Sequence, residues 1–366
     1  MTAGAFEWTA MAVKMLLWFV LLLQAAPVMT WIERRGAAMI QDRPGPNRLG
    51  PLGLFQVLAD AVKFIFKETL VPKGADKPLY LLAPILAIVP ALTTYVVLPL
   101  GPAMEIAGRT VNLIPSEGET GVLLFLAVSS LGIYSLILAG YSSNSKWALM
   151  GSIRAAAQLI SYELALTLSV VAVLLPAESL RLDRVVQYQI DHVWNVIPMF
   201  LGFVVFVIAS FAETNRLPFD LPEAESELVA GYHTEYGGMR FALFFMGEYM
   251  AMASLSALCA TLFLGGWHLP FGLFDQLASL FGRAIDVVWV FADIAPATQA
   301  GLGSAAAALT VLLAKISAFM FLFVWVRWTF PRFRYDQLMR LGWKILLPLA
   351  ILNLLLVAVM TLSGWL

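Results

Sequence analysis

Residues 121–141 read GVLLFLAVSSLGIYSLILAGY and contain no charged side chain. An α-helix rises about 1.5 Å per residue, so a stretch of this length can cross the roughly 30 Å hydrocarbon core of a bilayer. Similar apolar runs recur along the chain. The sequence therefore predicts an all-α polytopic membrane protein, with residues 1–366 forming a single integral membrane domain.

The overall composition agrees with a membrane protein. Of the 366 residues, 60% are hydrophobic and 13% are charged, about half of the roughly 25% that is usual in soluble domains. The 23 Lys and Arg and the 24 Asp and Glu residues are too few to cover a water-facing surface. A net charge of −1 provides no basic field for nucleic acid, so we expect no nucleic-acid partner.

Few residues are available for metal or nucleotide chemistry. The single cysteine, Cys259, permits neither an internal disulfide nor an iron–sulfur cluster. The histidines His192, His233 and His268 are far apart and lack the spacing of metal ligands. Walker and GxGxxG loops are absent from the sequence. We therefore expect this chain to bind no metal and no redox centre of its own.

Eight apolar segments predict eight transmembrane helices. They lie at about residues 10–32, 80–100, 121–141, 155–175, 195–213, 239–265, 304–326 and 343–365. Eight Lys and Arg follow the first span and five follow the seventh, whereas the alternate loops carry one or two. The positive-inside rule therefore places the basic loops in the cytoplasm and both termini outside. We interpret the segment 271–295 as interfacial, because its apolar run is broken by charges.

The first cytoplasmic loop, residues 33–79, contains a second kind of helix. Apolar residues recur at three- and four-residue steps over 52–68, and polar residues occupy the opposite side. This pattern predicts an amphipathic helix that is too short and too polar to span a bilayer. It is either an anchor in the headgroup plane or a wall of a cavity that an amphiphile enters from the lipid.

The third cytoplasmic loop, residues 213–240, is acidic. Asp220 and Glu223 flank Pro222 and predict the start of a short helix with a capping box. The loop has six carboxylates, at Glu213, Asp220, Glu223, Glu225, Glu227 and Glu235. Helix capping accounts for two or three of them. Crowding and partial burial favour proton uptake by the remainder, although a merely solvated acidic loop is the alternative.

Four ionisable residues of the predicted spans lie where no water should reach them: Glu163, Glu213, Glu248 and Lys315. Each costs roughly 2.5–3.5 kcal/mol at the centre of a membrane helix. They either hold the bundle together by pairing or form a proton relay. We favour the relay, because three of them are carboxylates that lead toward the acidic loop. Lys14, in the first span, can instead extend to the interface. Arg327, at the end of the seventh span, either reaches the interface or faces a cavity.

Several motifs together resemble the membrane subunit at the foot of respiratory complex I, which is called the H subunit in bacteria and subunit 1 in mitochondria. They are Glu33-Arg-Arg, Gly45-Pro-Asn-Arg-Leu-Gly, Gln56-x3-Asp60-x2-Lys63-x3-Lys67-Glu68, Ser161-Tyr-Glu163, Pro218-Phe-Asp-Leu-Pro-Glu-Ala-Glu225, Glu235-Tyr-Gly, Arg334-Tyr-Asp-Gln and Gly342-Trp-Lys. The likeness runs from the first span to the end of the chain. It departs at about 268–303, where this chain is longer than is usual in the family.

The resemblance implies two groups of functional residues. Those on the path of the quinone would be Glu33, Arg34, Asp60, Ala61, Lys63, Phe64 and Arg327. Those in the acidic funnel toward the proton pumps would be Glu163, Glu213, Arg216, Glu223, Glu225, Glu227, Glu235 and Glu248, to which the buried charge of Lys315 is added. In this interpretation the chain is part of an NADH:quinone oxidoreductase and is active only in the assembled complex.

The resemblance also implies partners and cofactors. Quinone, such as ubiquinone, would be the substrate, while NADH, FMN and iron–sulfur clusters would be bound by soluble partner subunits. Other partners would be the quinone-site subunit of the peripheral arm, small membrane subunits, antiporter-like pump subunits and the lipid bilayer. A bacterial inner membrane is favoured over a mitochondrial one.

Three other functions remain open. The membrane subunit of an energy-converting hydrogenase shares this fold, although the Pro218–Glu225 motif favours complex I. A secondary transporter would also bury carboxylates at mid-membrane, but it has no need of a basic loop with a fixed amphipathic helix. A purely structural anchor would gain nothing from the buried charges.

The predicted topology can be tested with introduced cysteines. In a Cys259→Ser background, a cysteine at Ser179 should react with a membrane-impermeant maleimide in intact cells, because the loop after the fourth span is predicted to lie outside. A cysteine at Lys73 should react only after the cells are opened. The reverse labelling pattern would contradict the orientation.

Overall fold

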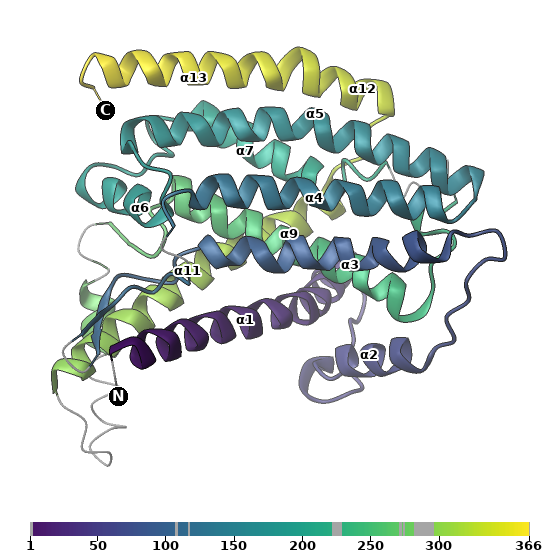
Figure 1. Ribbon diagram of the computed structural model, residues 1–366, viewed down its shortest axis with the longest axis horizontal. Helices are drawn as coiled ribbons and strands as arrows, with labels where there is room; N and C mark the ends of the chain where they lie inside the picture. The colour runs from purple at the N-terminus through teal and green to yellow at the C-terminus, as the bar shows by residue number, and fades with distance from the viewer. Residues whose placement is uncertain are drawn as a thin grey trace.

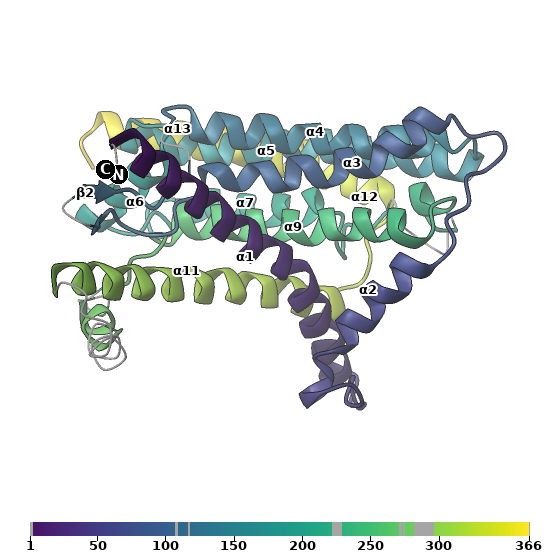
Figure 2. The same ribbon diagram turned by 60° about the horizontal axis from the view of Figure 1, so that its bottom comes forward.

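The computed structural model describes residues 3–106, 109–115, 118–221, 229–270, 273, 275–281 and 296–365. Helices dominate these residues, and most of them lie side by side in a bundle (Figure 1). The two ends of the chain lie at the same end of the bundle in both views (Figures 1 and 2). The all-α membrane fold expected from the sequence is confirmed.

The elements follow one another in a simple order. They are α1 (Ala3–Ile40), a 3₁₀ turn (Pro51–Gly53), α2 (Gln56–Phe66), α3 (Lys77–Thr93) with a 3₁₀ turn (Thr94–Val97), β1 (Met104–Ile106), β2 (Arg109–Val111), α4 (Gly121–Ser142), α5 (Lys146–Ala177), α6 (Leu182–Asp191), α7 (Phe200–Glu213), a 3₁₀ turn (Gly231–His233), α9 (Gly238–Phe263), α11 (Pro296–Thr329), α12 (Tyr335–Arg340), a π-helical turn (Leu341–Leu346) and α13 (Leu347–Leu362).

Seven helical segments of the described chain are long and apolar enough to cross a membrane. They belong to α1, α3, α4, α5, α9, α11 and the joined α12 and α13. The predicted count of eight is not confirmed, because α7 has only 14 residues, about 21 Å. The predicted span 195–213 was too long at its start. Pro198 disfavours helix for the residue before it, and the N–H of Val196 instead donates to the carbonyl of Phe263 at the end of α9.

Small residues allow the helices to pack closely. A Cβ atom added to Gly140 on α4 would lie 2.6 Å from the carbonyl oxygen of Ala148 on α5. A Cβ atom on Gly247 of α9 would lie 2.9 Å from the carbonyl oxygen of Ala87 on α3. Such contacts are typical of membrane helices, where dispersion rather than water exclusion drives association. They bring polar side chains of α3, α4, α5 and α9 within reach of one another.

The amphipathic helix α2 projects from the bundle beside the end of α1 (Figure 2). It begins later than the predicted range 52–68, because Leu52 and Gly53 have positive φ angles and interrupt the helix. The indole of Trp31 and the guanidinium of Arg35 both donate to the carbonyl of Leu52 at 3.1 Å. These two bonds fix the turn that directs α2 away from α1.

The loop between α3 and α4 is structured, and two other predicted segments are not described. A small antiparallel hairpin, β1 and β2, lies in the loop between α3 and α4. The ammonium of Lys14 donates to the carbonyls of Asn112 and Ile114 just after it. Residues 222–228 and most of 271–295 lie outside the described residues, so the predicted short acidic helix and interfacial segment are not described.

Two glycines on α4 offer a paired test of the packing. Gly140→Ala should lower the thermal midpoint of the purified protein, because the added methyl meets a backbone carbonyl and overpacking costs about 1–3 kcal/mol. Gly132→Ala should be tolerated, since no atom lies within 4 Å of the added Cβ. Equal midpoints for the two variants would contradict this account of the α4–α5 contact.

Candidate functional site

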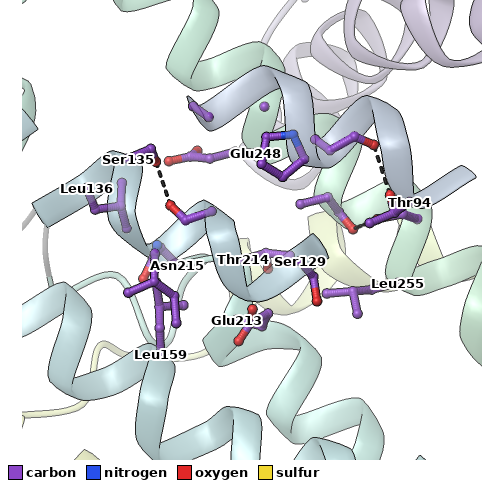
Figure 3. Close-up of a pocket in the computed structure, with 18 of the residues that line it drawn as sticks. Thr94, Ser129, Ser135, Leu136, Leu159, Glu213, Thr214, Asn215, Glu248 and Leu255 are labelled. Atoms are coloured by element: carbon purple, nitrogen blue, oxygen red, sulfur yellow. Dashed lines mark hydrogen bonds between the residues drawn. The ribbon is translucent and has the colours of Figure 1, made fainter. Parts of the chain in front are cut away.

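A pocket lies between α3, α4 and α9, and residues at the end of α7 also line it (Figure 3). It offers about 100 Å³ to water-sized spheres. A single water needs roughly 10–15 Å³ measured in this way, so the pocket has room for several. Glu213 and Glu248 both line it, together with Ser129, Thr214 and Asn215 (Figure 3).

The third intramembrane carboxylate lies next to this pocket. The hydroxyl of Ser130 on α4 donates to the carboxylate of Glu163 on α5. Glu163 is close enough to Glu213 for the two carboxylates to repel each other. One oxygen of Glu213 is buried without a hydrogen-bond partner among the described residues. Carboxylates from α7 and α9 therefore line a space with room for several waters, and a third carboxylate, from α5, lies beside it.

A buried guanidinium connects the pocket to a second group of charges. Arg216 lies in the loop after α7 and is 5% exposed. Its Nη2 is 3.7 Å from Glu248, and its Nη1 is 3.6 Å from Glu33 on α1. Its guanidinium lies 4.4 Å from the ring centroid of Tyr249, whose hydroxyl donates to Glu33 at 2.6 Å. Arg216 thus bridges carboxylates on two different helices.

Glu33 is the junction of this second group. It is 8% exposed and also accepts a hydrogen bond from Arg327 at the end of α11. Arg327, Glu33, Arg216 and Glu248 alternate in charge and sum to zero when all four are ionised. Pairing of this kind is what allows charges to stay buried. Within the part of the chain that the structure describes, Glu163 and Glu213 have no such cation.

The predicted quinone-path residues on α2 are more exposed than the residues around Arg216. Asp60 accepts a hydrogen bond of 2.5 Å from Arg34, which joins α2 to α1. The ring of Phe64 lies 6.4 Å from that of Phe241 on α9. Ala61 and Lys63 are exposed, and no residue of α2 is buried. The apolar side of α2 is therefore free, within the described chain, to contact lipid, substrate or a partner.

Two predicted relay residues do not join the pocket. The ammonium of Lys315 donates to the carbonyls of Leu264, Gly266 and His268, at 2.6, 2.8 and 2.6 Å. These acceptors follow the end of α9 at Phe263, and 15 helical residues, about 22 Å, separate Phe263 from Glu248. Glu235 takes part through its backbone, whose carbonyl accepts from the hydroxyl of Tyr80. Three other predicted relay residues, Glu223, Glu225 and Glu227, lie outside the described residues.

Some polar residues of the site are not among those that the sequence singled out. Tyr232 donates to Glu248 at 3.0 Å, Tyr249 donates to Glu33, and Ser130 donates to Glu163. Tyr249 follows Glu248 directly in the sequence, which is a usable signal. Ser130 and Tyr232 have no signal of this kind, because their partners lie far away in the chain.

The described residues contain no group of three or more His, Cys, Asp or Glu side chains arranged to hold a metal ion. The chemistry available here is that of carboxylates, guanidinium groups and hydroxyls. Such an arrangement can hold protons and pass charge between neighbours.

Comparisons with known proteins match the chain over almost its whole length. The family described as NADH dehydrogenase matches residues 13–358. The NADH-quinone oxidoreductase subunit designated H 1 in Geobacter metallireducens is 45% identical over 365 residues, covering 100% of this chain and 98% of the relative. The H subunit of Leptospira biflexa is 44% identical over 369 residues, covering 97% of each. The subunit designated H 2 in Geobacter sulfurreducens is 46% identical over 352 residues, covering 96% of this chain and 94% of the relative.

The position of Lys315 allows a test of whether its ammonium stabilises the turn after α9. Lys315→Met should lower the thermal midpoint of the protein, because it removes the hydrogen-bond donor of three carbonyls that follow α9. Leaving a buried polar group unsatisfied costs about 1–3 kcal/mol. Lys315→Arg should retain most of the stability. A Lys315→Met variant with an unchanged thermal midpoint would contradict this stabilising role.

Proposed function

The chain belongs to the NADH dehydrogenase family as a membrane subunit of NADH-quinone oxidoreductase, and from this premise we propose that it couples quinone reduction to proton movement. The quinone headgroup binds on the α1–α2 side of the molecule. The carboxylates around the pocket respond to its reduction. The observation that carries this proposal is the position of Arg216 between Glu33 and Glu248.

The quinone end is formed by residues on α1, α2 and α11. They are Glu33, Arg34, Asp60, Ala61, Lys63, Phe64 and Arg327. The exposed apolar side of α2 suits an isoprenoid tail, and the guanidiniums of Arg34 and Arg327 suit an oxygen that gains negative charge during reduction. Electrons come from iron–sulfur clusters of soluble partner subunits, which receive them from NADH through FMN.

The coupling step is electrostatic. Two unit charges about 4 Å apart interact by roughly 4 kcal/mol at an effective dielectric constant of ~20. Negative charge on the quinone draws Arg327 away from Glu33, and Glu33 in turn attracts Arg216. Glu248 then loses part of its cation and takes up a proton. Arg216 suits this exchange, because its Nε and Nη2 have no hydrogen-bond partner among the described residues.

The protons then move among the three carboxylates of the pocket. Glu248, Glu213 and Glu163 surround or adjoin a space with room for several waters, and water can carry protons between them. Glu163 is partially exposed at the surface of the bundle. From Glu163 the charge passes to small membrane subunits and antiporter-like pump subunits. The chain works in the inner membrane of a bacterium, with both termini on the periplasmic side.

Neutralising the carboxylates tests the relay. Glu248→Gln and Glu213→Gln should each lower coupled NADH:quinone reduction and proton pumping by roughly 10²-fold, the scale of a lost proton-transfer group. Assembly of the complex should survive, because an amide keeps the shape and can still accept from Tyr232.

The matched control is Glu178→Gln, which alters an exposed carboxylate at the end of α5 and should leave turnover unchanged. Glu213→Gln or Glu248→Gln complexes that pump at the wild-type rate would refute the relay.

A further inference from the structure

One buried amide lies behind the loop that carries Arg216. Gln158 is in the first half of α5 and is fully buried, with 0% exposure. Its Nε2 lies 2.8 Å from the carbonyl oxygen of Ala212 and 2.9 Å from that of Phe219. It also lies 3.2 Å from Oδ1 of Asn215. One side chain therefore binds the end of α7 and the far side of the following loop.

The contacts fix the orientation of this amide. Oxygen and nitrogen of a glutamine side chain are distinguished by their hydrogen-bond partners. Three oxygens surround one terminal atom of Gln158, so that atom must be the nitrogen. The other terminal atom, Oε1, is buried without a hydrogen-bond partner among the described residues. Oε1 thus accepts no hydrogen bond from the described residues, whereas the Nε2 amino group donates to the end of α7 and to the loop after it.

The two carbonyls bound by Gln158 enclose Arg216. The N–H of Arg216 donates to the carbonyl of Phe211 at 3.3 Å, and the N–H of Phe219 donates to the carbonyl of Arg216 at 2.8 Å. Backbone bonds and the Gln158 bonds together close a ring from the end of α7 to Phe219. Arg216 lies within the segment that these bonds hold, and in this arrangement its guanidinium lies 3.6 Å from Glu33 and 3.7 Å from Glu248.

We propose that Gln158 is the positioning residue of the coupling site: by fastening Ala212 and Phe219 to α5, it holds Arg216 between Glu33 and Glu248. The three contacts of the Gln158 amide go to neither of these carboxylates. It acts through Arg216. The inference rests on the proposed function and adds a residue to it.

The chain supplies a matched control for a test. Gln189 on α6 is also a buried amide, with 2% exposure, and its Nε2 donates to the carbonyl of Thr261 near the end of α9. Its Oε1 accepts from the N–H groups of Asn195 and Gly265. Gln158→Leu and Gln189→Leu therefore remove the same chemical group, but only the first is next to the Arg216 loop.

The first experiment compares these two variants in membranes that contain the assembled complex. Both should lower the thermal midpoint. Only Gln158→Leu should lower the kcat of NADH:quinone reduction, by about tenfold or more as for a misplaced group near a reaction site, with the KM for quinone unchanged. Equal kcat values for the two variants would overturn the positioning role.

A double variant shows whether Gln158 acts through Arg216. Arg216→Gln and the Gln158→Leu, Arg216→Gln double variant should have the same kcat, because residues that act as one unit are not additive. A further loss in the double variant, equal to that of Gln158→Leu alone, would overturn the proposal. An Arg216→Gln variant with wild-type turnover would instead overturn the proposed coupling function.

A milder variant covers the case in which leucine prevents assembly. Gln158→Glu keeps the size of the side chain, and its protonated form retains one donor. Its turnover relative to wild type should recover as the buffer changes from mildly alkaline to mildly acidic. A constant ratio across that range would overturn the role of the Gln158 donor.

Discussion

The buried guanidinium of Arg216 lies between two carboxylates on different helices of the bundle. Arg216 lies 3.6 Å from Glu33 and 3.7 Å from Glu248, distances that make it an ion-pair partner of both without a short bond to either. Burying a charge is costly unless it is paired, and Arg216 is a cation for Glu33 on α1 and for Glu248 on α9. It therefore provides an electrostatic connection between the two carboxylates.

The rest of the site follows from the cost of charge in a membrane. Glu33 is buried, and two guanidiniums and the Tyr249 hydroxyl compensate it. Glu163 and Glu213 have no cation among the described residues and instead lie beside a space that can hold water. A space of this size is large enough for water that can solvate the two carboxylates. Ion pairing on one side and solvation on the other are thus two ways to lower the same desolvation penalty.

The sequence predicted those residues of the site that interrupt an apolar run. Glu163, Glu213 and Glu248 stand out because each interrupts an apolar run, and the structure brings them together. Lys315 stands out equally, but its partners are backbone carbonyls, which any residue can provide. Gln158 is neutral and was not singled out. The start of α7 was misplaced because the turn at 195–199 depends on a contact with the end of α9, and residues 196–199 look like the rest of an apolar span.

Infrared difference spectroscopy of the intact complex tests the central claim most directly, because protonated carboxyl groups absorb apart from the amide bands. Reduction of bound quinone should give carboxyl difference bands that are lost in part in Glu213→Gln and in Glu248→Gln. In Arg216→Gln the same bands should vanish or change, although both carboxylates are present. Bands that are identical in wild type and in all three variants would show that quinone reduction does not reach these carboxylates, and would contradict the coupling described here.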